Sequence, residues 1–228
     1  MAKLRGRFLT LEGGEGAGKS TQGRRLKRRL EAMGLEVMLT REPGGSPRAE
    51  RIREVLLGGE PKAYGPFAEG LLFAAARADH VDQTIGPALG RGAFVVCDRF
   101  TDSTRVYQGV LGEVSERVLA SLERVALGVV TPDLTLVLDV PAKLGLARAT
   151  ERRQASGQAA DRFETEGVAF HSRIREAFLA IAAAEPNRCA VVDASGPPDN
   201  VERLIWAEVE QRLLTLAMPE PGRVCHDV

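Results

Sequence analysis

Residues 13–20 combine residue types and a spacing that can hold phosphate. They read Gly-Gly-Glu-Gly-Ala-Gly-Lys-Ser and match the pattern Gly-x-x-x-x-Gly-Lys-Ser/Thr at every position. Glycines let backbone N–H groups turn towards an anion, and a helix that begins there adds partial positive charge. Lys19 can reach the outer phosphates of a nucleotide, and the Ser20 hydroxyl can bind Mg²⁺.

The surroundings of this motif decide between a phosphate site and a glycine-rich turn that binds nothing. An apolar run at 8–11 precedes the motif, and a helical pattern at 21–31 follows it. Strand, glycine loop and helix are the context that the motif requires. The sequence therefore predicts a nucleoside triphosphate site.

Short apolar runs and helical patterns alternate along the chain. The runs lie at 8–11, 35–39, 93–97, 134–138 and 189–192 and suit buried parallel strands. The helical patterns cover 21–33, 47–57, 67–89, 113–127, 142–153, 166–185 and 199–216. This alternation predicts an α/β fold with a parallel sheet covered by helices on both faces. We expect one domain over 1–218 with a short mobile lid at about 152–163, and a loose tail over 219–228.

Charged residues follow the predicted strands at the edge where such sheets bind ligands. Asp98 and Arg99 come directly after the strand at 93–97. A surface ion pair is the alternative, but both residues should lie near the phosphate loop. We expect Asp98 to hold the metal ion and Arg99 to bind a phosphate through two parallel hydrogen bonds.

Two further groups of residues could take part in catalysis or binding. The polar segment 154–161 is flanked by Arg152, Arg153 and Arg162 and is either a lid that brings guanidinium groups to a phosphoryl group or a plain surface loop. Phe73 and Arg77 share a helix face and could hold a planar base. From these two residues alone, the favoured interpretation is that Phe73 belongs to the core and that the Arg77 side chain extends to solvent.

Composition excludes several classes of function. The chain has 31 basic and 31 acidic residues, so no bulk charge indicates nucleic acid or a membrane surface as a partner. No apolar run approaches a membrane span, and the N-terminal apolar stretch is too short for a signal peptide. The three cysteines are scattered and suit reduced thiols in the cytoplasm. We expect no histidine metal site, and we place His80 and His171 on helix surfaces.

These motifs together resemble the bacterial thymidylate kinases, over about residues 7–215. The resemblance rests on Glu-Gly-Gly-Glu-Gly-Ala-Gly-Lys-Ser-Thr at 12–21, Thr-Arg-Glu-Pro-Gly-Gly at 40–45, Phe-Ala-Ala-Ala-Arg at 73–77, Asp-Arg-Phe at 98–100, Pro-Asp-Leu-Thr at 132–135 and Asp-Arg-Phe-Glu at 161–164. It implies a P-loop kinase with a five-stranded parallel sheet that moves the γ-phosphoryl group of ATP to dTMP, giving dTDP, with Mg²⁺. It also implies a homodimer packed through helices.

The resemblance implies a role for each matching residue. ATP would be bound by Gly13, Gly14, Glu15, Gly16, Ala17, Gly18, Lys19, Ser20, Thr21 and Arg148. The acceptor dTMP would be bound by Glu15, Glu42, Pro43, Gly44, Arg53, Phe73, Arg77, Arg99, Ser103, Thr104, Tyr107 and Gln108. Within this set, Phe73 would stack on thymine, Arg77 and Thr104 would bond its edge, and Tyr107 would disfavour ribonucleotides.

Some members of this family carry an arginine in the phosphate loop itself. Here the residue after Glu15 is Gly16, so the loop supplies none. The resemblance then implies that the catalytic arginine comes from the lid, with Arg152, Arg153 and Arg162 as candidates beside Lys19 and Arg99. The sequence leaves open which of the three acts.

Two rival classes remain. A GTPase should carry Asp-x-x-Gly after the third strand and Asn-Lys-x-Asp later, but residues 98–101 read Asp-Arg-Phe-Thr and the second motif is absent. The nearer rival is a kinase for another nucleoside monophosphate. Tyr107 and the Phe73–Arg77 pair favour dTMP, with some activity on dUMP.

Overall fold

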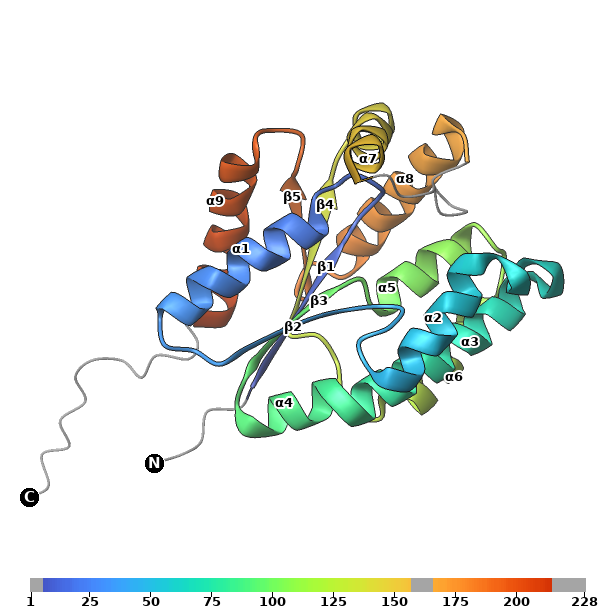
Figure 1. The fold of residues 1–228 in the computed structure, drawn as a ribbon, viewed down its shortest axis with the longest axis horizontal. Helices are drawn as coiled ribbons and strands as arrows, with labels where there is room; N and C mark the ends of the chain where they lie inside the picture. Colours follow the sequence, from blue (N-terminus) through green and yellow to red (C-terminus); the bar gives the residue numbers. More distant parts are fainter. Residues whose placement is uncertain (1–5, 157–165, 215–228) are drawn as a thin grey trace, which may run out of the picture.

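The computed structural model describes residues 6–156 and 166–214, which form a parallel sheet between two layers of helices (Figure 1). The strands are β1 (Arg7–Glu12), β2 (Val37–Arg41), β3 (Phe94–Asp98), β4 (Leu134–Asp139) and β5 (Cys189–Asp193). They lie in the order β2-β3-β1-β4-β5, and every neighbouring pair is parallel. The predicted α/β fold and its five strands are confirmed.

Helices connect the strands. They are α1 (Lys19–Ala32), α2 (Pro47–Gly58), α3 (Gly65–His80), α4 (Gly86–Arg91), α5 (Thr101–Thr104), α6 (Glu116–Leu127), α7 (Ala142–Ser156), α8 (Val168–Ala184) and α9 (Pro198–Val209). A 3₁₀ helix covers Glu60–Tyr64, and π-helical turns cover Val81–Ile85, Arg105–Val110 and Glu210–Leu214. In the described parts of the chain, no helix is long and apolar enough to cross a membrane.

Two helical segments differ from the prediction. The single helix expected over 67–89 is divided, because the π-helical turn Val81–Ile85 separates α3 from α4. The helical segment of α5 and the π turn that follows it, over 101–110, was missed, since Thr, Asp and Ser are weak helix formers. The domain limits stay a prediction, the tail over 219–228 lies outside the described residues, and so does most of the expected lid.

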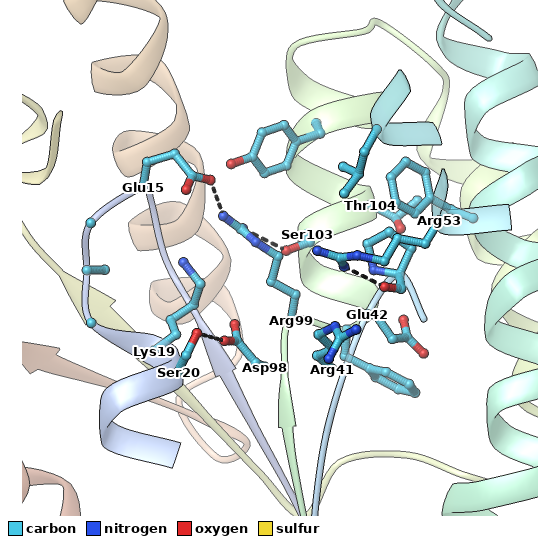
Figure 2. Close-up of a pocket in the computed structure, with 18 of the residues that line it drawn as sticks. Glu15, Lys19, Ser20, Arg41, Glu42, Arg53, Asp98, Arg99, Ser103 and Thr104 are labelled. Carbon is cyan, nitrogen blue, oxygen red and sulfur yellow. Dashed lines mark hydrogen bonds and ion pairs between the residues drawn. The ribbon is translucent and has the colours of Figure 1, made fainter. Parts of the chain in front are cut away.

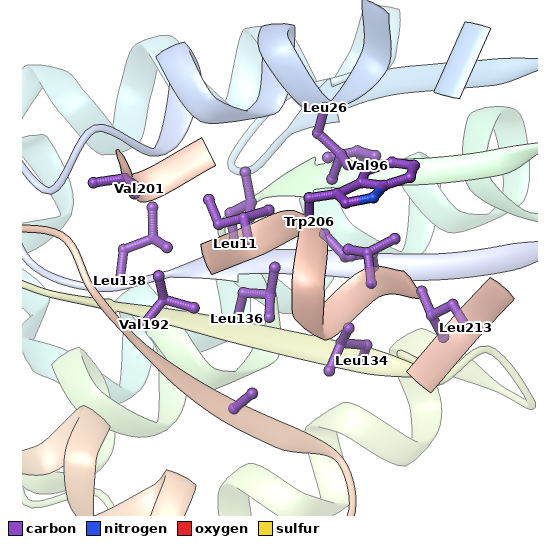
Figure 3. Close-up of a cluster of buried hydrophobic side chains, with 14 of the residues drawn as sticks. Leu11, Leu26, Val96, Leu134, Leu136, Leu138, Val192, Val201, Trp206 and Leu213 are labelled. Atoms are coloured by element: carbon purple, nitrogen blue, oxygen red, sulfur yellow. The ribbon is translucent and has the colours of Figure 1, made fainter. Parts of the chain in front are cut away.

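The core follows from the alternation of side chains along the strands. On one face, Leu11, Leu136 and Val192 pack against α1 and α9 around Trp206 (Figure 3). On the other face, Val95 and Cys97 pack against the 81–88 segment, and Val137 packs against α8. Each fully buried large apolar side chain stabilises the fold by about 1.5–3 kcal/mol relative to exposure. This packing holds the strands in place, and with them the loops that leave their carboxyl ends.

Strand register brings the predicted site residues to one edge. Leu11 of β1 and Arg41 of β2 both pair with Asp98 of β3, so these three strands end at the same level. The phosphate loop leaves β1 at that level, and Arg99 leaves β3 there. Residues from three separated parts of the sequence therefore meet at the carboxyl ends of the strands.

Candidate active site

The phosphate loop has the backbone conformation that its glycines allow. Gly13, Gly16 and Gly18 have φ angles of 132°, 67° and 88°, a region that other residues rarely adopt. Lys19, the first residue of α1, donates from Nζ to Gly13 O at 3.0 Å and to Gly14 O at 2.8 Å. Burial, together with the positive charge of Arg99, lowers the pKa of Lys19 to about 8. An anionic ligand at the loop would oppose both effects.

Ser20 and Asp98 lie together at the start of α1. The Ser20 hydroxyl donates to Asp98 Oδ2 at 2.6 Å (Figure 2). A hydroxyl and a carboxylate beside a phosphate loop are the oxygen donors that suit Mg²⁺, which takes few protein ligands when phosphates supply the others. The described residues contain no cluster of three or more His, Cys, Asp or Glu side chains that could hold a metal ion.

Arg99 lies between the phosphate loop and α5 (Figure 2). Its Nη1 donates to Gly13 O and to Ser103 Oγ, both at 3.2 Å, and its Nη2 pairs with the Glu15 carboxylate. Burial opposes ionisation of Glu15, but Arg99 and Lys19 outweigh it and hold the pKa of Glu15 below its ordinary value. Both residues therefore stay charged near neutral pH, and Arg99 bridges the phosphate loop and Ser103.

A single pocket of about 580 Å³ spans the loop and the segments opposite it. Its lining includes most predicted site residues, namely Glu15, Gly16, Ala17, Gly18, Lys19, Ser20, Thr21, Glu42, Pro43, Arg53, Phe73, Arg77, Asp98, Arg99, Ser103, Thr104, Tyr107, Gln108, Arg152 and Arg153. Of the other predictions, Gly13 and Gly14 lie in the loop behind Lys19, Gly44 and Arg148 are not in the lining, and Arg162 lies outside the described residues.

Arg77, on α3, lines the pocket, and only 2 % of it is exposed. Its Nε donates to Glu42 Oε2 at 2.7 Å, and its Nη2 donates to Phe100 O and Thr104 Oγ1, both at 3.1 Å. The idea that Arg77 reaches solvent beside a core Phe73 is wrong, because the guanidinium is enclosed and bonded while half-buried Phe73 lines the pocket.

His80 and His171 are not on helix surfaces, and that prediction is wrong for both. His80 is fully buried, with Nε2 at 2.7 Å from Thr40 Oγ1 and Nδ1 at 3.0 Å from Glu42 Oε1. Glu42 therefore joins His80 to Arg77 and fixes the floor of the pocket. His171, on α8, is also buried, and its ring is edge-on to Phe170.

The wall opposite α3 comes from the helical segment 101–110. Thr104 and Gln108 are buried one turn apart, and Gln108 Nε2 donates to Glu69 Oε2 at 3.3 Å. Tyr107 is half-buried, with its ring 5.4 Å from the Arg99 guanidinium carbon. Burial raises the pKa of Tyr107 above its ordinary value, so its hydroxyl stays protonated. The segment thus presents polar groups and one ring to the pocket.

Helix α7 carries arginines towards the mouth of the pocket. Exposed Arg152 and half-buried Arg153 line it from the last turns of α7. Arg148 donates to the carbonyl oxygens of Ala194 and Ser195, at 2.7 and 2.6 Å, in the loop after β5. The start of α7 touches the phosphate loop so closely that a Cβ added at Gly16 would lie 1.9 Å from Gly145 O.

Sequence reasoning missed four residues of the lining, namely Arg24, Arg41, Leu57 and Phe100. Arg41 follows a predicted strand, so its position was a usable signal. Arg24 lies one helical turn from Thr21 and Ser20, on the same side of α1. Leu57 and Phe100 are apolar and carry no signal in the sequence that separates a pocket wall from the core.

Comparisons with known proteins agree with this geometry. The family model described as thymidylate kinase matches residues 11–205. A thymidylate kinase from a Bradyrhizobium species is 56 % identical over 211 residues, covering 92 % of each chain, and one from Nitrobacter winogradskyi is 57 % identical over 92 % of this chain and 91 % of its own. A crystal structure of thymidylate kinase from Ehrlichia chaffeensis matches with a TM-score of 0.70 and 29 % identity, covering 90 % of this chain and 98 % of that one. Since the model and these relatives cover nearly the whole chain, this protein belongs to the thymidylate kinase family.

Proposed function

We propose that the pocket binds ATP on the phosphate loop and dTMP between α3 and the 101–110 segment, and joins their phosphates at Arg99. Membership of the family gives the reaction itself: ATP and dTMP are converted to ADP and dTDP. The position of Arg99 carries the proposal, because one guanidinium touches Gly13 and Glu15 on the donor side and Ser103 on the acceptor side.

The chemical step needs charge neutralisation more than proton transfer. An oxygen of the dTMP phosphate forms a bond to the γ-phosphorus of ATP, the bond from that phosphorus to the bridging oxygen breaks, and ADP leaves with the electron pair. The attacking oxygen is already anionic at neutral pH, so no general base is required. Lys19 and Arg99 place positive charge around the transferring group, and the pocket aligns the two phosphates.

The acceptor base would lie between Phe73 and the polar floor. Phe73 offers a ring for stacking, and Arg77 and Thr104 offer donors at the edge of a planar base. Glu42 and the Phe100 carbonyl hold the Arg77 guanidinium in place before any ligand arrives. Tyr107 lies beside Arg99, where it would meet the sugar and disfavour a 2′-hydroxyl. This arrangement supports dTMP as the acceptor.

On the donor side, Ser20 and Asp98 would hold Mg²⁺, which neutralises phosphate charge when it is bound. The contacts of Arg148 with the loop after β5 support the proposal that the adenine lies beside that loop. Arg152 and Arg153 line the same pocket, and we propose that at least one of them reaches the γ-phosphate. Arg162 stays a third candidate from outside the described residues.

A coupled ADP-release assay with Mg-ATP and six acceptors tests the proposal. The acceptors are dTMP, dUMP, UMP, CMP, AMP and GMP. We expect turnover with dTMP, weak turnover with dUMP and none with the other four. Fast turnover on another acceptor would reject Phe73, Arg77 and Tyr107 as readers of thymidylate. ADP release that no acceptor changes would reject phosphoryl transfer to a nucleotide.

We also propose that the chain forms a homodimer through α2 and α3. Large apolar side chains are exposed along this part of the molecule: Val55 by 40 %, Tyr64 by 80 %, Phe67 by 50 % and Leu71 by 44 %. Phe67 and Leu71 are four residues apart and share one face of α3. Such a row of exposed apolar residues is typical of a protein interface.

Sedimentation of two charge variants tests the dimer. Phe67→Asp should shift the chain to a monomer, whereas Leu204→Asp on α9 should leave its mass unchanged. Leu204 is a fair control because it is exposed by a similar fraction, 47 %, and lies on the other side of the sheet. A monomeric unmodified chain would reject the proposal.

The cysteines support our proposal that the chain works in the cytoplasm. Cys97 and Cys189 are buried and free, as in proteins of a reducing compartment. Burial also raises the pKa of both thiols, which keeps them protonated and unreactive. Cys225 lies outside the described residues.

A further inference from the structure

We propose that Glu12 is a positioning residue for phosphoryl transfer, which holds the Arg99 guanidinium at the phosphate loop through Ser103. Glu12 is the last residue of β1 and lies just before the motif at 13–20. Its side chain is fully buried and is not part of the pocket lining. The inference rests on the proposed role of Arg99 as the phosphate clamp.

Three hydrogen bonds join the Glu12 carboxylate to the segment that carries Arg99. Its Oε1 accepts from the backbone N–H groups of Phe100 and Ser103, at 2.7 and 3.2 Å. Its Oε2 accepts from the Ser103 hydroxyl at 2.7 Å. A buried carboxylate is costly unless it is bonded in this way, so the bonds fix the turn from β3 into α5 against the end of β1.

Ser103 passes this constraint to the guanidinium. Its hydroxyl donates to Glu12 and accepts from Arg99 Nη1 at 3.2 Å. Arg99 also has a φ of 68°, a left-handed conformation that a non-glycine residue keeps only when its surroundings hold it. Glu12 contributes to that hold on the C-terminal side of the turn, through Phe100 and Ser103, while the Arg99 N–H donates to Leu11 O at 2.9 Å. Glu12 thus acts on the backbone of Arg99 through the turn and on its Nη1 through Ser103.

The charge of Glu12 changes near neutral pH. Burial and the negative charge of Asp102 raise the pKa of Glu12 to about 7, against the effects of Ser103, Arg99 and the Phe100 N–H. The titratable groups whose electrostatics couple to Glu12 are Asp102, Arg99, Lys19, Cys97 and Tyr107. Once protonated, Glu12 becomes a donor to the Ser103 hydroxyl oxygen and competes there with Arg99 Nη1. The hold on Arg99 is then weaker below about pH 7.

Glu12→Gln separates positioning from simple support of the fold. Glutamine keeps the size of the side chain but places an N–H₂ donor where Ser103 needs an acceptor. We expect kcat to fall about 10- to 100-fold, since a small misplacement of a catalytic group has that effect. The KM for ATP should stay within twofold. Asp139→Asn is the matched control, because Asp139 ends β4 but its carboxylate binds Arg175 instead of a pocket residue.

The pH profile of kcat gives a readout that a merely structural role would not move. The unmodified enzyme should lose activity as the pH falls below about 7, and Glu12→Gln should lack that limb. The phosphate of dTMP also titrates, with a pKa near 6. The loss of activity caused by the dTMP phosphate should remain in the unmodified enzyme, in Glu12→Gln and in Asp139→Asn. Only the loss at low pH that disappears in Glu12→Gln is therefore due to Glu12.

Two further variants keep the test decisive. If Glu12→Gln fails to fold, Ser103→Ala removes the link and leaves Glu12 in place, and it should also lower kcat. A variant that folds with the kcat and pH profile of the unmodified enzyme would overturn the proposal. Arg99→Ala separates the role of Arg99 as phosphate clamp from the positioning role of Glu12. If this variant keeps full activity, Arg99 is not the phosphate clamp. If it is inactive while Glu12→Gln and Ser103→Ala are normal, only the positioning role fails.

Discussion

The two sides of the pocket are built differently. On the acceptor side, Arg77 is 2 % exposed and makes three hydrogen bonds to Glu42, Phe100 and Thr104. On the lid side, Arg152 is exposed and reaches the pocket from the end of α7. The acceptor side is therefore held by the packed core, whereas the lid side is a helix end beside the mouth. Substitutions should cost stability and activity on the first side and activity alone on the second.

Arg99→Ala should have the largest effect, since Arg99 belongs to the well-packed side and also touches the loop. Removing one preorganised donor for transition-state charge lowers kcat by about 100- to 1000-fold. Steady-state kinetics with saturating dTMP and Mg-ATP measures this. Arg91→Ala is the control, because Arg91 is half exposed and pairs with Glu36 on the surface. Full activity in Arg99→Ala would remove the phosphate clamp from the mechanism.

Arg77→Ala tests whether the acceptor side supports the fold as well as the substrate. It leaves the buried Glu42 carboxylate without its cation, which costs about 3–5 kcal/mol of unfolding free energy. Urea denaturation measures that loss, and the KM for dTMP should rise. Arg77→Ala combined with Glu42→Gln should recover part of the stability. A stability within 0.5 kcal/mol of the unmodified chain (about the surface-mutation range) would contradict the comparison.

Arg152→Ala and Arg153→Ala test the lid side. At least one of them should lower kcat by about 10- to 100-fold, since each could supply charge to the transferring phosphoryl group. Neither should change the unfolding free energy by more than about 0.5 kcal/mol. Arg173→Ala, an exposed position on α8, is the control. If both lid variants keep normal kcat, Arg162 becomes the remaining candidate.

Phe73→Leu should have the smallest effect. Leucine keeps an apolar contact but loses the ring, and aromatic stacking contributes about 0.5–1.5 kcal/mol beyond area burial. The KM for dTMP should therefore rise by about 2- to 12-fold, with kcat and the KM for ATP little changed. Phe170→Leu on α8, outside the pocket lining, is the control. An unchanged KM for dTMP would move the base away from Phe73.

The sequence allowed the fold and the loop to be predicted because both depend on local patterns. The strands are short apolar runs, and the loop at 13–20 is a contiguous motif. The helical segment 101–110 was missed because its first residues favour turns, and its start is held by Glu12, about 90 residues earlier in the chain. The helix propensity of a short segment cannot predict a hydrogen bond to a residue so distant in the sequence.

The burial of polar side chains was the second feature that the sequence did not predict. The helical pattern placed His80 on a helix correctly but could not show that Thr40 and Glu42 bury it. The same pattern found Arg77 but not the three partners that enclose its guanidinium. Arg162 and the rest of the 157–165 segment lie outside the described residues, so the catalytic lid arginine stays a prediction.

The contact between Gly16 and Gly145 limits how this protein can evolve. Any side chain at position 16 would occupy the place of the Gly145 carbonyl, and a Cβ at Gly145 would lie 2.3 Å from the Glu15 carbonyl oxygen. Neither glycine can be exchanged alone without moving the start of α7 away from the loop. An arginine at position 16 would therefore require the backbone at the start of α7 to move, because the atom in its way is the Gly145 carbonyl oxygen and no exchange of the residue at 145 removes it.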